Sequence, residues 1–143
     1  MIGALIAKSK VRKGFSRLNN RDVASFTSDW AEDATFIYPG HISVSGEFKG
    51  KKAIEEWFGK MMAQFPQISF TLKHICVQNI FDMTGTNHIA AEWDVKLTNK
   101  EGKEIQNSGV TTLDIKMGKA ILVRDYIFDS EKVKIGWGEG ENR

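Results

Sequence analysis

Cysteine, proline and histidine are scarce in this chain of 143 residues. The single cysteine, Cys76, has no partner in the chain for a disulfide, so nothing requires an oxidising compartment, and we expect it to be a small buried residue. The three histidines are too scattered for the ligand spacing of a zinc site. The two prolines, Pro39 and Pro66, each stand where a helix or strand should end.

Long apolar runs and an excess of charge are also missing. No segment approaches the roughly 18 apolar residues of a membrane span. The apolar stretch Met1–Ala7 is followed by positive charge, the wrong order for a secretory signal, so we expect a cytoplasmic protein. The net charge of +2 is too small to indicate nucleic acid, and we interpret the basic cluster at residues 8–13 as a solvated helix face rather than a phosphate site. P-loop, dinucleotide, nucleophile-elbow and haem motifs are absent, so no cofactor is expected.

The periodicity of apolar residues changes near residue 67. Before it, helical spacing predicts helices over 3–18, from 21 to about 30 and over 53–65, with short strands at 33–38 and 43–48. After it, the period of two predicts long strands at 68–81, 86–99, 103–117 and 119–129, and their short connections require antiparallel pairing. The sequence therefore predicts an α+β domain over 1–130, with helices on one sheet face, and a loose tail over 131–143 that Ile135 and Trp137 could tether.

One carboxylate interrupts the apolar face of the last strand. Ile121, Val123, Asp125 and Ile127 alternate along 119–129 and should point the same way. A carboxylate on such a face must form an ion pair or hydrogen bonds, lie in a water-filled pocket or have a raised pKa. Asp125 is therefore the main candidate for chemistry, the alternative being an ion pair with a helix residue such as Arg12 or Arg17.

Further residues with polar groups lie on the apolar faces of the neighbouring strands. Asn107 and Thr111 alternate with apolar residues on one strand, and Trp93 stands on the inward face of another. A few polar groups in an apolar lining are typical of a ligand pocket, so all three are candidate ligand-binding residues. Alternatively, Trp93 belongs to the core, and Asn107 bridges the backbone at a bulge beside Gly109.

Aromatic residues and histidines supply the remaining candidates. Tyr38 and His41 flank the Pro39-Gly40 turn and could close the mouth of the pocket as catalytic groups, although His41 could equally be a surface loop residue. Trp30 and Trp57, on predicted helices, are further candidate ligand-binding residues. His74 falls on an apolar strand face and is interpreted as a core or sheet-edge histidine.

Three segments carry a family resemblance: residues 30–41 (WAEDATFIYPGH), 45–58 (SGEFKGKKAIEEWF) and 118–126 (GKAILVRDY). Together they resemble the SnoaL-like branch of the nuclear transport factor 2-like superfamily. The resemblance implies a cystatin-like α+β roll, in which a cone-shaped, curved antiparallel sheet wraps around N-terminal helices. It also implies a deep apolar cavity and dimers formed through the sheet.

The resemblance transfers functional residues only in part. Steroid isomerases of the superfamily have a general-base aspartate where this chain has Tyr38, and an acidic oxyanion donor where it has Val110 or Thr111. Polyketide cyclases of the superfamily have an acid–base aspartate that matches Asp125. Arg124 neighbours Asp125 and should face the opposite side of the sheet, which argues against the Asp–Arg–Asp set of the limonene epoxide hydrolases.

Two functions follow from these observations. The first is a cofactor-free isomerase, cyclase or dehydratase that uses Asp125 as a base on a small apolar carbonyl compound, with Tyr38, His41 or Asn107 as hydrogen-bond donors. The second is a non-catalytic module of the same fold that binds a hydrophobic ligand or supports assembly. In either case we expect a homodimer through the outer sheet face, where Leu122, Tyr126 and Phe128 form an apolar patch.

Overall fold

Four helices and six strands follow one another in a computed structural model that describes residues 2–139. The helices are α1 (Ile2–Asn19), α2 (Val23–Thr27), α3 (Lys51–Gln64) and α4 (Ser130–Gly136). The strands are β1 (Trp30–Tyr38), β2 (Gly46–Lys49), β3 (Gln67–Val77), β4 (Asn87–Thr98), β5 (Glu104–Lys116) and β6 (Lys119–Ile127). Trp30, expected on the second helix, instead opens β1.

All six strands form one sheet in the order β2-β1-β6-β5-β4-β3. The predicted antiparallel meander of β3 to β6 is confirmed, with uninterrupted pairing between β4 and β5 from Asn87↔Ile115 to Thr98↔Glu104. The sequence did not indicate that β1 pairs in parallel with β6, which places the early Pro39 turn beside the last strand. The short hairpin of β1 and β2 therefore extends the meander at the β6 edge.

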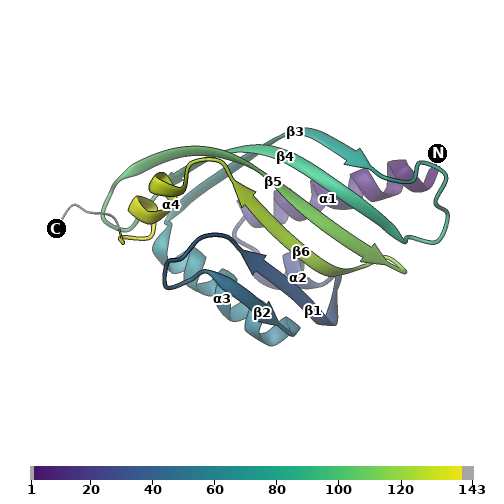
Figure 1. Cartoon of the computed structure of the whole chain (residues 1–143), viewed down its shortest axis with the longest axis horizontal. Coiled ribbons are helices and arrows are strands. Elements are labelled where there is room, and N and C mark those ends of the chain that lie inside the picture. Colours follow the sequence, from purple (N-terminus) through teal and green to yellow (C-terminus); the bar gives the residue numbers. More distant parts are fainter. Residues whose placement is uncertain (1, 140–143) are drawn as a thin grey trace.

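The sheet curves over the helices, and the apolar core lies between them. Figure 1 shows the long strands arching over α1 and α3, with the hairpin of β1 and β2 beside α3. On α3 the i, i+3, i+4 stripe buries Ile54, Trp57, Phe58 and Met61, as its spacing predicts. These side chains pack against β1, where Phe36 is 1% exposed. The expected α+β roll, with a curved sheet around N-terminal helices, is confirmed.

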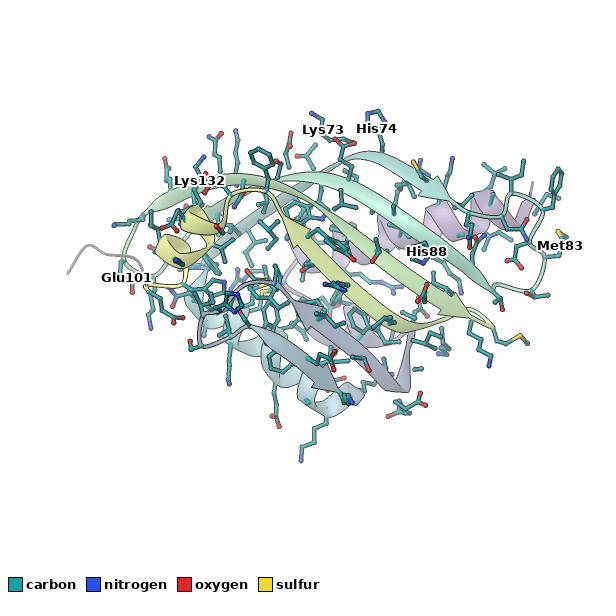
Figure 2. All side chains as sticks on the ribbon, viewed as in Figure 1. Lys73, His74, Met83, His88, Glu101 and Lys132 are labelled. Atoms are coloured by element: carbon teal, nitrogen blue, oxygen red, sulfur yellow. The ribbon has the colours of Figure 1, made fainter. Side chains whose placement is uncertain are left out.

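Two β-bulges change which side chains face the core. The register of β3 against β4 shifts between Leu72 and His74, and that of β5 against β6 shifts next to Ile121. Each shift inserts a residue and reverses the alternation beyond it. The predicted inward positions of His74, Cys76 and Ile121 are therefore wrong: all three are exposed, and Figure 2 shows His74 beside Lys73 on the outside of the sheet.

The segment after β6 is folded, which corrects the expectation of a loose tail. Asp129 caps α4 by accepting hydrogen bonds from the backbone of Glu131 and Lys132 at 3.1 Å. Trp137, one of the two predicted tethers, packs against Phe65 and Trp57. The rest of the predicted tail, residues 140–143, lies outside the described residues.

The start of α1 also departs from the expected pattern. Helical spacing in the sequence predicts that Leu5, Val11 and Leu18 share one buried face of α1, but Leu5 is 65% exposed, whereas Val11 and Leu18 are buried. Ala4 of the first turn is buried, but the larger side chains of Ile2 and Ile6 beside it are exposed to solvent. Within residues 2–139, no helix combines the length and the apolar character needed to cross a bilayer.

Candidate active site

A cavity of about 130 Å³ lies between the concave sheet face and the helices. Its wall is mostly aromatic and aliphatic, and Phe36, Trp57 and Trp93 belong to it. Cavities of roughly 150 Å³ in other proteins hold a benzene ring. The space therefore suits a ligand of about one ring, held mainly by apolar contact.

Asp125 is the carboxylate of this cavity. It lies on β6 directly opposite Thr111 of β5, and the Thr111 hydroxyl donates a hydrogen bond of 2.6 Å to its Oδ1. The Trp93 indole Nε1 donates in turn to the Thr111 hydroxyl at 2.9 Å. Three neighbouring strands thus form the chain Trp93–Thr111–Asp125, which fixes one carboxylate oxygen. Among the described residues, nothing donates a hydrogen bond to the other oxygen, Oδ2.

The surroundings of Asp125 disfavour its negative charge. Burial raises the pKa of this carboxyl from 3.8 to about 6, and the hydrogen bond from Thr111 opposes that rise. The alternative of an ion pair is not realised: Arg17 pairs with Asp29 at 3.4 Å, and no cation of residues 2–139 lies within salt-bridge distance of Asp125. A carboxyl group with a pKa near 6 can take up and release protons close to neutral pH.

Tyr38 brings a hydroxyl group to the same cavity from the end of β1. Its oxygen accepts a hydrogen bond of 3.0 Å from Trp137 Nε1. Burial raises the pKa of the Tyr38 phenol above its usual range; the charge of Asp125 acts in the same direction, and the Trp137 donor opposes both. The phenol therefore stays protonated, with its acceptor position filled and its own proton available for donation.

Two predicted site residues, His41 and Asn107, are placed differently from the expectation. His41 is exposed and does not line the cavity, because the chain turns at Gly40 with a φ of 89° and leaves His41 in the loop. Asn107 borders the cavity, but its amide donates to Asp129 O at 2.9 Å and accepts from Asp129 N at 3.1 Å. Asn107 therefore bridges backbone, as the alternative predicted, and joins β5 to the start of α4. The bulge expected beside Gly109 is not there, because the register of β5 shifts only between Asp114 and Ile115.

The two remaining candidates, Trp30 and Trp57, belong to the wall of the cavity. Trp57 Nε1 donates to Val44 O at 2.9 Å, which fixes the ring. Trp137 was expected only as a tether, and its hydrogen bond to Tyr38 was not predicted. Val133 and Trp137 stand four residues apart, which is the spacing of an apolar helix face, so the sequence could have indicated the helix but not its contact with Tyr38.

A comparison of the sequence with known families agrees with the fold. Residues 11–123 match the family described as SnoaL-like domain. The chain belongs to this family. The resemblance seen in the three sequence segments is thereby confirmed, and the SnoaL-like match covers every strand up to the middle of β6. Asp125 lies just beyond the matched residues.

Solved structures of SnoaL-like and related proteins share the fold over nearly the whole chain. A proposed isomerase from Bacillus subtilis has a TM-score of 0.79 and 25% identity and covers 98% of each chain. Bal32a, from a soil-derived mobile gene cassette, has a TM-score of 0.80 and 21% identity over 94% of this chain and 98% of its own. A proposed SnoaL-like polyketide cyclase from Jannaschia sp. CCS1 has a TM-score of 0.74 and 9% identity over 92% and 91%. A search of curated proteins finds no match.

Proposed function

We propose that this SnoaL-like protein is a cofactor-free acid–base enzyme, of the isomerase, cyclase or lyase type, that acts on a small apolar carbonyl compound. One observation carries the proposal: a carboxylate with a pKa of about 6 faces an apolar cavity and has a single hydrogen-bond donor. An aspartate that served only the fold would be expected to have an ion pair or several donors. Asp125 has neither among the described residues.

The reaction begins with proton transfer from carbon. Asp125, ionised above pH 6, removes a proton from the carbon next to the substrate carbonyl through its free Oδ2. The C–H electron pair moves toward the carbonyl oxygen and forms an enolate. Asp125 then returns the proton to another carbon, to a leaving group, or to the alkoxide that forms when the enolate carbon attacks a second carbonyl. These three outcomes are isomerisation, elimination and cyclisation, and all conserve atoms and electrons.

Tyr38 stabilises the negative charge that develops on the carbonyl oxygen. Its hydroxyl proton is free to bind the enolate oxygen because Trp137 already occupies an acceptor site on the same oxygen. A donor held in an apolar cavity stabilises an oxyanion more than the same donor in water. The high pKa of Tyr38 keeps the group a hydrogen-bond donor rather than a competing base.

The test is deuterium exchange at the carbon next to the carbonyl of single-ring ketones, cyclohexanone and acetophenone, followed by NMR in D₂O. We expect catalysed exchange whose rate rises as the pH passes through about 6, the pKa of Asp125. Asp125→Asn should lose about 10²- to 10⁴-fold of the catalysed rate, and Tyr38→Phe about 10²-fold. Asp33→Asn, an equal change at an exposed position of β1, is the control and should keep the full rate. Exchange that survives in Asp125→Asn would remove Asp125 from the mechanism.

The second candidate is a non-catalytic protein that binds a hydrophobic ligand. Its support is the mainly apolar cavity with its aromatic wall, together with Tyr38 at the position where the resemblance to steroid isomerases would require an aspartate. The same ketones distinguish the two functions. Quenching of tryptophan fluorescence without deuterium exchange, and binding that is equal or tighter in Asp125→Asn, would favour the binding protein.

A further inference from the structure

Most of the exposed large apolar side chains of residues 2–139 gather at one end of the molecule. The first turns of α1, the loop between β3 and β4 and the turn between β5 and β6 meet there. Gly118 N donates to Gly85 O at 3.0 Å, Met117 N donates to Thr86 Oγ1 at 3.2 Å, and Gly3 packs directly against the carbonyl group of Asp82. We call this end the apolar tip, and its exposed side chains are Ile2, Leu5, Ile6, Ile80, Phe81, Met83 and Met117.

The apolar tip is large and projects outward. Phe81 and Met83 are each 72% exposed and Met117 is 71% exposed. Figure 1 shows that the N-terminal end and the loop between β3 and β4 share this end, and Figure 2 shows Met83 projecting from it. Three separate segments thus bring exposed apolar side chains to one end, and a concentration of this kind is typical of an interaction site.

Positive charge borders the apolar tip. The first acidic residue of the sequence is Asp22, so all the charged side chains of α1 are basic. At the turn between β5 and β6 the charged residues are Lys116 and Lys119. We call these residues the basic collar: Lys8, Lys10, Arg12, Lys13, Lys116 and Lys119. None of them forms an ion pair within residues 2–139. Asp82, in the loop between β3 and β4, accepts hydrogen bonds from the hydroxyl of Thr84 and from the backbone of Thr84, Gly85 and Thr86.

We propose that the apolar tip docks on the surface of an anionic phospholipid membrane, with its side chains among the acyl chains and the basic collar at the headgroups. Apolar side chains beside lysine and arginine are the combination that binds the interface of an anionic bilayer. A second copy of this chain fits the tip poorly, because it would bring two basic collars together. This docking does not depend on the chemistry of the cavity.

Sedimentation with vesicles tests the proposal on the full chain. We expect binding to vesicles of phosphatidylcholine mixed with phosphatidylglycerol, weaker binding to phosphatidylcholine alone, and release as salt is added. The double variant Phe81→Ser/Met83→Ser should bind the mixed vesicles at least about tenfold more weakly because it loses apolar contact. Lys8→Glu/Lys13→Glu should lose at least about tenfold because each lysine near an anionic surface contributes about fivefold.

A matched charge change at the opposite end is the control. Lys100→Glu/Lys103→Glu alters two exposed lysines beside Glu101, which Figure 2 shows at the end away from Met83. This variant should bind the mixed vesicles like the unaltered protein. The proposal is overturned if the unaltered protein does not sediment with mixed vesicles, if the tip variants bind equally well, or if the control loses as much binding. It is also overturned if light scattering shows a dimer that only the Phe81→Ser/Met83→Ser change dissociates, because the tip would then bind a second copy.

Discussion

Replacing the cavity carboxylate should make the protein more stable, by an amount that depends on pH. In the folded protein the pKa of Asp125 is about 6, whereas its ordinary value is 3.8. Between these values the folded state keeps a proton that the unfolded state has released. The free energy of unfolding therefore falls as the pH rises from about 4 to about 6, and the loss is complete above pH 7.

The size of the effect follows from the same two pKa values. Their difference corresponds to about 3 kcal/mol, which is the cost of holding the Asp125 charge in the cavity. Asn cannot ionise, and its carbonyl oxygen can still accept the hydrogen bond from Thr111. We therefore expect Asp125→Asn to raise the free energy of unfolding by as much as about 3 kcal/mol at pH 8 and by close to zero at pH 4.

Urea unfolding followed by tryptophan fluorescence at several pH values measures this difference. With an m-value of about 2 kcal/mol per molar, the midpoint should rise by roughly 1.5 M at pH 8 and hardly at pH 4. The exposed control Asp33→Asn should stay within about 0.5 kcal/mol of the unaltered protein at each pH. A gain for Asp125→Asn that is the same at pH 4 and pH 8 would refute the argument, because it could not come from a buried charge.

Two further predictions concern the edge and the outer face of the sheet. The side-chain amide of Asn19, at the end of α1, accepts a hydrogen bond from Phe70 N of edge strand β3 at 2.7 Å and donates one to Phe70 O at 2.9 Å. Asn19→Ala should therefore lower the free energy of unfolding by about 1–3 kcal/mol in urea, while exposed Asn20→Ala should change it by less than about 0.5 kcal/mol. Tyr126 and Phe128 are 47% and 87% exposed on the outer side of β6, so we still predict a homodimer through this face. Light scattering should show a dimer at micromolar concentration that Tyr126→Ser/Phe128→Ser converts to monomer, and a monomeric unaltered protein would contradict the prediction.

The helices, the meander and the inward position of Asp125 could be predicted from the sequence. Helical and strand periodicities are properties of neighbouring residues along the chain, so the stripe on α3 and the alternation on β4 and β5 identify their buried faces directly. Asp125 was predictable for the same reason, since Val123 and Ile127 mark its face. Only Ile121, beyond the bulge, was assigned to the wrong side.

The tertiary structure decided which of these inward residues meet, and which outward residues gather. A bulge depends on the register with a partner strand, so sequence alternation could not place His74 or Cys76 on the outside. The bond between Trp137 and Tyr38 joins residues 99 positions apart, which no local pattern reports. The apolar tip likewise forms only where the start of α1 meets two turns, because segments distant in sequence become neighbours when the sheet curves over the helices.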